Sequence, residues 1–181
     1  MRRRPVSLLL LLAIPTLLQA ASLIRNGDFE NVADSGQPRH WVSAQHAGGK
    51  AYEFVSTTDS VHKGERSMMI RRFKPQIWGL TEQIIDAEAL VGKTLEFSIA
   101  ARAEQVGESG AALYLSAFSG SSLITQQDLR LVGDQDWKKH TLRLEIPEGT
   151  TKVRVGVSLD DAGTVWIDDA RLIVVKRARK S

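Results

Sequence analysis

The sequence of 181 residues contains no cysteine. A disulfide framework is therefore excluded, and so is lipid attachment to an N-terminal cysteine. Small extracellular domains without disulfides need a sizeable hydrophobic core. We expect the folded part of this chain to be held together by core packing alone.

The apolar run over residues 6–18 is too short for a membrane span, which needs about 20 apolar residues. It follows Arg2, Arg3 and Arg4 and precedes Gln19-Ala20-Ala21, which is the order of the basic, apolar and small-residue parts of a secretory signal peptide. We therefore expect residues 1–21 to be a signal peptide cleaved near Ala20 or Ala21. The mature protein would then be secreted or periplasmic, with no stable membrane insertion. An N-terminal membrane anchor is the alternative.

The excess of positive charge is confined to the two ends of the chain. Three of the 24 basic residues lie in the leader and four lie in residues 176–181, so 17 remain beside all 21 acidic residues. Binding to nucleic acid needs basic residues clustered on the folded body, so we expect no nucleic-acid partner. The basic tail 176–181 is either a solvated end or a contact for anionic lipid or polymer.

A long helical period is also missing. Leu95, Phe97, Ile99 and Ala101 alternate with polar residues instead, the period-two pattern of a strand with one buried face. Similar short segments recur about every 8–12 residues, with one helical turn expected at 86–90. We predict a single antiparallel β-sandwich or jelly roll over residues 22–175. The expected strands are 23–30, 40–44, 51–55, 67–73, 78–85, 95–102, 113–118, 123–131, 142–146, 153–159 and 163–172.

Motifs for catalysis are missing as well. The segments 107–110 and 119–122 do not form G-x-S-x-G, and Gly48-Gly49-Lys50 lacks the rest of a phosphate-binding loop. The four histidines lack the spacing of metal ligands. We therefore expect no enzymatic activity.

The last expected strand contains two adjacent acidic residues, Asp168 and Asp169, within an otherwise apolar run. Neighbouring carboxylates in a half-buried strand repel each other and lose hydration. Backbone N–H groups, a basic side chain or a cation must therefore accept them.

Three segments carry a resemblance to a known family: 26–30 (Asn-Gly-Asp-Phe-Glu), 92–98, and 137–169 with its Ile-Pro-Glu-Gly and Val-Trp-Ile-Asp-Asp motifs. In this order they resemble the carbohydrate-binding modules of the galactose-binding-like jelly-roll superfamily, the kind attached to xylanases and cellulases. The resemblance implies non-catalytic binding of a polysaccharide or oligosaccharide. It also implies a structural Ca²⁺ between Glu30 and Asp168, whereas backbone hydrogen bonds to the same aspartate are an equal alternative.

Sugar recognition combines an aromatic ring for stacking with planar polar side chains for hydroxyl groups. The alternation and the resemblance together point to a ligand face away from the core, although Ala100 replaces an aromatic residue on the cleft floor of several binding members. Trp41, Trp137 and Trp166 are expected in the core or at its rim. A structural or adaptor protein that docks an envelope protein is the competing hypothesis. The expected ligand-binding residues are Trp78, Gln83, Arg102, Tyr114 and Arg154.

Overall fold

The computed structural model describes residues 20–175, so the basic tail and almost all of the expected signal peptide lie outside the described part. The predicted antiparallel β-sandwich is confirmed, with eight strands in this range instead of the eleven expected segments. The expected helical turn is a single 3₁₀ turn, η1 (Glu88–Leu90). Within 20–175, no helix has the length and apolarity needed to cross a membrane. The strands are β1 (Val42–Gln45), β2 (Tyr52–Thr57), β3 (Ser67–Arg72), β4 (Gly79–Asp86), β5 (Thr94–Ser119), β6 (Ser122–Glu145), β7 (Lys152–Leu159) and β8 (Gly163–Val175).

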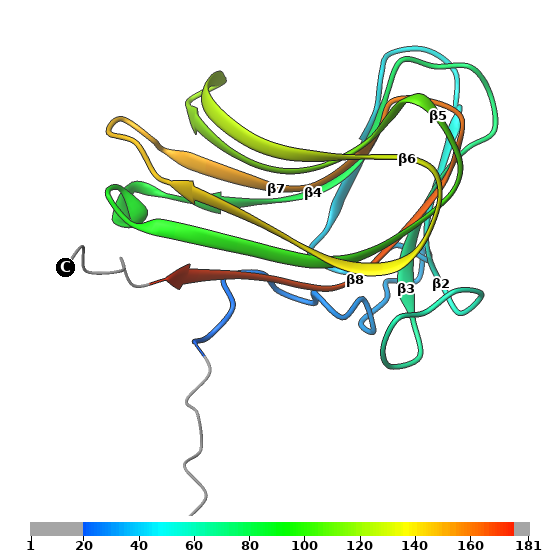
Figure 1. The fold of residues 1–181 in the computed structure, drawn as a ribbon, viewed down its shortest axis with the longest axis horizontal. Coiled ribbons are helices and arrows are strands. Elements are labelled where there is room, and N and C mark those ends of the chain that lie inside the picture. The colour runs from blue at the N-terminus through cyan, green and yellow to red at the C-terminus, as the bar shows by residue number, and fades with distance from the viewer. Residues whose placement is uncertain (1–19, 176–181) are drawn as a thin grey trace, which may run out of the picture.

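The long hairpin of β5 and β6 belongs to both layers of the sandwich (Figure 1). Residues 94–104 of β5 pair with β8, whereas residues 111–118 pair with β7. We call β1, β4, β7, the second half of β5 and the first half of β6 the groove sheet. The back sheet consists of β2, β3, β8 and the other halves of β5 and β6.

The hairpin bends because its pairing is irregular at the centre. The register between β5 and β6 shifts repeatedly between Ala101 and Ala111, and Gly110 and Gly133 have positive φ angles of 77° and 70°. Extra residues of this kind bend a strand without ending it. The expectation of separate strands at 95–102 and 113–118, and at 123–131 and 142–146, was therefore wrong, since each pair forms one continuous strand with irregularities between its two parts.

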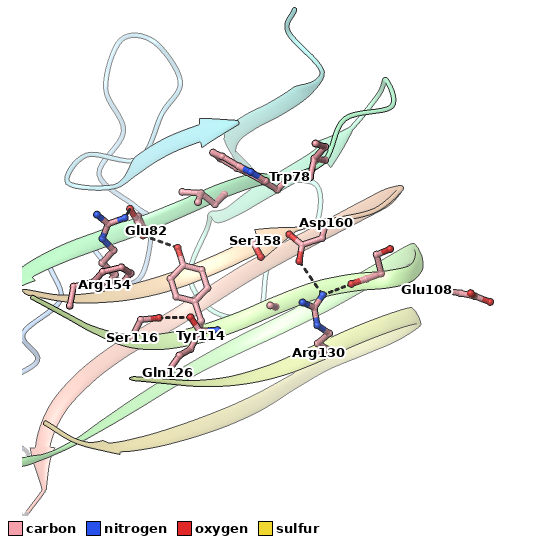
Figure 2. A pocket seen from close by; sticks show the side chains of 15 residues that line it. Trp78, Glu82, Glu108, Tyr114, Ser116, Gln126, Arg130, Arg154, Ser158 and Asp160 are labelled. Atoms are coloured by element: carbon pink, nitrogen blue, oxygen red, sulfur yellow. Dashed lines mark hydrogen bonds and ion pairs between the residues drawn. The ribbon is translucent and has the colours of Figure 1, made fainter. Parts of the chain in front are cut away.

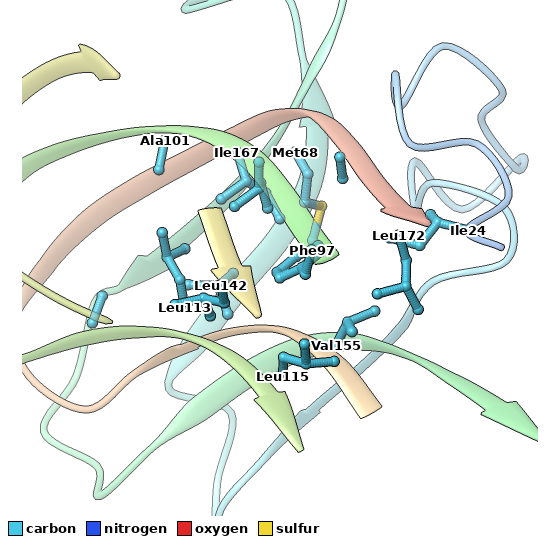
Figure 3. Close-up of a cluster of buried hydrophobic side chains, with 14 of the residues drawn as sticks. Ile24, Met68, Phe97, Ala101, Leu113, Leu115, Leu142, Val155, Ile167 and Leu172 are labelled. Carbon is cyan, nitrogen blue, oxygen red and sulfur yellow. The ribbon is translucent and has the colours of Figure 1, made fainter. Parts of the chain in front are cut away.

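The core lies between the two sheets and follows the predicted alternation (Figure 3). Leu95, Phe97 and Leu113 are completely buried, as are Val155 and Leu172. Complete burial of such a side chain contributes about 1.5–3 kcal/mol each. Because residues of one strand alternate between core and surface, the outer face of each sheet carries polar side chains beside some apolar ones.

The N-terminal segment does not form the strand expected at residues 23–30. Asn26 and Phe29 have positive φ angles of 50° and 57°, which interrupt an extended chain. The segment instead contacts β8 through two backbone hydrogen bonds, from Leu23 N to Leu172 O at 2.7 Å and from Ala170 N to Gly27 O at 2.8 Å. It therefore closes one end of the core.

Candidate functional site

A groove of about 870 Å³ runs along the outer face of the groove sheet (Figure 2). Four strands supply its floor, and the segments before β4, within β5 and after β7 supply its ends. The lining side chains mix apolar, neutral polar and charged groups. They are Ile77, Trp78, Leu80, Glu82, Glu108, Ser109, Ala112, Tyr114, Ser116, Phe118, Gln126, Arg130, Arg154, Ser158 and Asp160.

A row of three residues crosses the floor. Gly156 on β7 pairs with Tyr114 on one side and with Glu82 on the other. Because Gly156 has no side chain, the Tyr114 hydroxyl reaches across β7 and donates a hydrogen bond to Glu82 Oε2 at 2.8 Å. Burial of Tyr114, followed by the neighbouring Glu82 carboxylate, raises the pKa of the tyrosine hydroxyl, which therefore stays a donor at neutral pH.

Arg154 lies beside this row. Its Nη1 is 3.5 Å from Glu82 Oε1, and its guanidinium lies over the Phe118 ring at 4.5 Å from the ring centroid. The Nε of Arg154 is buried and has no hydrogen-bond partner among the described residues. The arginine is thus fixed in place while much of its hydrogen-bonding capacity is unused.

The opposite end of the groove contains a second ion pair. Arg130 Nη1 donates to Asp160 Oδ2 at 3.0 Å and to the Ser109 carbonyl oxygen. Between the two ends, Ser116 donates to Gln126 Oε1 at 2.8 Å. The polar side chains of the floor therefore hold one another in position, which reduces the entropic cost of ordering them around a ligand.

An apolar wall borders the polar floor on the β4 side. Trp78 is half-buried, and its carbonyl oxygen accepts a hydrogen bond from His46 N at 2.9 Å. The His46 ring meets the indole edge-on at 6.0 Å, and the adjacent Ile77 is 61% exposed. A fixed aromatic ring beside hydrogen-bonding groups matches the two requirements of a sugar site.

The structure brings three of the five expected ligand-binding residues together in this groove, and the other two lie outside it. Trp78, Tyr114 and Arg154 line it. Gln83 instead faces inward, where its amide bonds both the N–H and the carbonyl of Arg25 at 3.1 and 2.6 Å. The Gln83 side chain therefore holds the N-terminal segment against the core.

Arg102, the other residue outside the groove, lies on the back sheet. Its guanidinium covers the Trp166 ring at 4.7 Å and lies 3.4 Å from Glu104. It lines a separate hollow of about 380 Å³ with Glu104, Asp134 and Asp136. The strand alternation had assigned Arg102 correctly to a non-core face, but the bend in β5 sends that face to the other side of the molecule.

The other residues considered from the sequence also lie outside the groove. Ala100 is buried on the back sheet opposite Asp168, so it is not part of the groove floor. Trp41 is a core residue, as expected, and Trp166 is buried beneath Arg102. Trp137 is half-buried on β6 beside the His62 ring at 5.6 Å.

Several groove residues were missed from the sequence, above all Glu82, Phe118 and Arg130. In β4 the polar residues Thr81 and Gln83 face the core, which hides the role of the intervening Glu82. Arg130 and Gln126 share one face of β6 by simple alternation. This alternation can be read from the sequence. The sequence does not show that this part of β6 pairs with β5 beside the groove.

Glu30 and Asp168 meet at one loop, residues 58–66, although they come from opposite ends of the chain. Glu30 Oε1 accepts hydrogen bonds from the N–H groups of Glu65 and Arg66 at 2.7 and 3.1 Å. The buried Asp168 Oδ2 accepts those of His62 and Lys63 at 3.1 and 2.9 Å. Backbone hydrogen bonds to Asp168, the alternative to a calcium ion, are therefore present in the structure.

Burial raises the pKa of Asp168, and the backbone N–H donors oppose this shift. No basic side chain forms an ion pair with Asp168 or Glu30 in the part of the chain that the structure describes. Within the same residues, no cluster of three histidine, cysteine or acidic side chains is suited to a metal ion. A cation between Glu30 and Asp168 would thus have two carboxylates and otherwise depend on carbonyl oxygens or water, a donor set that Ca²⁺ accepts.

Comparison with known proteins shows which solved structures share the fold of this chain. No protein family model matches the sequence. A curated relative, the uncharacterized HTH-type transcriptional regulator YbfP of Bacillus subtilis (strain 168), is 26% identical over 124 residues. The match covers 66% of this chain and 38% of that protein, so the chain spans little more than a third of the length of this relative.

The solved structures with a similar fold include many carbohydrate-binding modules. TmCBM61, solved with β-1,4-galactotriose, has a TM-score of 0.59 and 18% identity, and the match covers 86% of this chain and all of that module. The enzymatically active domain of tailspike protein 4 of bacteriophage CBA120 has a TM-score of 0.65 and 13% identity, covering 85% of this chain and 21% of that one. Modules of families 4, 16 and 22 share the fold as well. The resemblance read from the sequence is therefore confirmed: the chain has the β-sandwich jelly-roll fold of the carbohydrate-binding modules.

Proposed function

We propose that the protein binds a glycan, without catalysis, in the groove of the groove sheet. The observation that carries this proposal is the fixed Trp78 ring beside a floor of preorganised polar side chains. A sugar ring would stack on the indole while its hydroxyl groups bond the floor. Structural neighbours include modules solved with or named for such ligands, among them galactotriose and xylan.

A binding role is favoured over hydrolysis by how the groove carboxylates are used. Glu82 accepts the Tyr114 hydroxyl and pairs with Arg154, and Asp160 pairs with Arg130. A glycosidase needs one carboxylic acid to donate a proton and a second carboxylate to act as base or nucleophile. Carboxylates that already serve as structural acceptors are poorly suited to either task, and the remaining groove carboxylate, Glu108, could supply only one of the two.

Affinity gel electrophoresis against a panel of soluble xylans, galactans and glucans tests the proposal. We expect retardation by at least one polymer, and we expect Trp78→Ala to abolish it. Trp137→Ala is the matched control, since this tryptophan lies outside the groove. If no polymer retards the protein and a protein partner co-purifies with it, the adaptor role in the cell envelope replaces glycan binding.

The calcium expectation remains a proposal about stability. A Ca²⁺ ion held by Glu30 and Asp168 would offset their charge and secure the loop 58–66, adding to the N–H bonds that already anchor it. We expect EDTA to lower the melting temperature and added Ca²⁺ to restore it, whereas Glu30→Gln makes the melting temperature insensitive to both. An unchanged melting temperature in the native protein rules out the ion.

The location outside the cytoplasm also remains a proposal. It rests on the order of basic, apolar and small residues within residues 1–21. N-terminal sequencing of the protein recovered from culture medium and periplasm tests it. A mature chain that begins near Ala21 or Ser22 is the expected result, and a chain that still begins at Met1 contradicts it.

A further inference from the structure

The Arg154 end of the groove is chemically different from the Arg130 end. Arg130 is engaged by a carboxylate at 3.0 Å and by a backbone carbonyl. Arg154 has only the 3.5 Å contact with Glu82, which is its one ion pair among the described residues. Figure 2 shows the two arginines at separate places along the groove.

Glu82 is a weak partner for Arg154 because it is already engaged. Its Oε2 accepts the Tyr114 hydroxyl at 2.8 Å, and its side chain is 8% exposed. The Arg154 side chain is 33% exposed. Glu82 therefore supports the guanidinium from the floor, while part of Arg154 remains accessible from the groove.

The guanidinium is held ready for an acceptor from outside the protein. Phe118 fixes its plane from one face at 4.5 Å, and the buried Nε has no partner in the described part of the chain. A guanidinium carries five N–H donors in a planar fork, and this fork matches a carboxylate in a bidentate arrangement. Leaving such donors unpaired in a partly desolvated site is unfavourable, so an acceptor stabilises it.

The surrounding charges do not cancel this preference. Lys152 lies on the same face of β7 as Arg154 and adds a second positive charge. Asp86 is the residue of β4 that lies opposite Lys152 in the strand register. The groove acids Asp160 and Glu108 lie near Arg130 (Figure 2). Among the carboxylates that line the groove, Glu82 is the one in contact with Arg154, and it is buried and also accepts the Tyr114 hydroxyl.

We infer that Arg154 recognises a carboxylate on the glycan, so that the preferred ligand contains uronic acid residues. This inference rests on the proposed function of the groove and narrows its ligand class. The accessible part of the Arg154 guanidinium would contact the uronate, while the buried Nε would stay out of reach and the rest of the sugar chain would follow the groove towards Trp78.

The test compares acidic polymers with their own neutral forms. Glucuronoxylan and polygalacturonate are each used as such and after reduction of the carboxyl groups to hydroxymethyl groups, and dissociation constants are measured by calorimetry at low and physiological salt. We expect carboxyl reduction to weaken binding about tenfold, the scale of one hydrogen bond to a charged group. Arg154→Gln should remove this difference, and Arg154→Lys should restore part of it.

Arg143→Gln is the matched control for simple charge attraction. Arg143 is an exposed arginine on the back sheet, paired with Glu96 at 2.6 Å, so its loss changes net charge equally and leaves the groove intact. Binding of native and reduced polymers with equal affinity overturns the inference and leaves glycan binding in place. An equal loss in the Arg143 and Arg154 variants also overturns it, and no binding to any form of any polymer contradicts the proposed function itself. Melting temperatures show that each variant is folded.

Discussion

The hydroxyl of Tyr114 and the carboxylate of Glu82 are joined by a 2.8 Å hydrogen bond across β7, a strand that carries only Gly156 between them. The two side chains together span two strand spacings, and the bond between them connects the middle of the groove sheet to its β4 side. It also fixes the carboxylate on which Arg154 depends. One buried acid therefore organises the groove floor.

Replacing Tyr114 by Phe should destabilise the protein and loosen this floor. The variant leaves a buried carboxylate with one donor fewer, which costs about 1–3 kcal/mol. Urea unfolding measures the loss, and a double-mutant cycle with Glu82→Gln isolates the coupling between the two side chains. A coupling free energy near zero would contradict the central role of the bond.

Gly156→Ala should be far more damaging than its small size suggests. A Cβ atom at this position would overlap with Thr81 O and lie 2.8 Å from Glu82 Cα, and β4 can move away only by disturbing its pairing with β7. Overpacking of this kind typically costs about 1–3 kcal/mol. Gly49→Ala is the control, because a Cβ there meets nothing within 4 Å. Thermal melting of both variants checks the prediction, and equal melting temperatures would contradict it.

The sequence predicted the fold because alternation reports burial directly. Leu95, Phe97 and Ile99 are in the core as expected, and so are Leu113 and Leu115. The pattern does not report which sheet a strand joins. Continuous pairing through the bend of β5 is set by contacts between distant segments, and these have no local signature.

The candidate site was therefore predicted only in part. Tyr114 and Arg102 both lie on non-core faces of β5, yet the bend places them on different sheets. Gln83 was predicted to face the ligand but is buried, and the reason is different. Its burial becomes favourable only because the backbone of Arg25, 58 residues away, supplies both a donor and an acceptor.

Asp168→Asn should lower stability without weakening binding in the groove. The carboxylate accepts three backbone N–H groups, those of His62, Lys63 and Asp169, whereas an amide offers one oxygen and turns two hydrogens towards donors. We expect a loss of about 1–3 kcal/mol. Asp168 lies on β8 of the back sheet, so polysaccharide affinity should be retained.

Asp169→Asn is the control for this substitution. Among residues 20–175, the Asp169 side chain forms a single ion pair, at 3.6 Å with Lys139, which is 52% exposed. Pairs of this type contribute about 0–1 kcal/mol. Denaturant unfolding and calorimetric titration of both variants separate the two roles, and a loss of binding in a stable Asp168 variant would make Asp168 a functional residue.

His140 should make the protein sensitive to mild acid. Its ring is buried beside the core, Nε2 has no partner among the described residues, and burial followed by the charge of Lys138 lowers the pKa. The unfolded chain, with an ordinary histidine pKa near 6.5, therefore takes up the proton first. The contribution of neutral His140 is complete above this pH and is lost as the pH falls below it, at a slope of at most about 1.4 kcal/mol per pH unit.

His140→Leu should remove that part of the pH dependence. The leucine places an apolar side chain beside Leu142 and cannot be protonated, so the free energy of unfolding of the variant should rise relative to that of the native protein as the pH falls from 7 to 5. Urea unfolding at half-unit pH steps measures the two profiles. Carboxylates titrate in both proteins and cancel in the difference. Parallel profiles over this range would mean that the histidine is protonated equally in the folded and unfolded chains, and that its burial does not disfavour the charged ring.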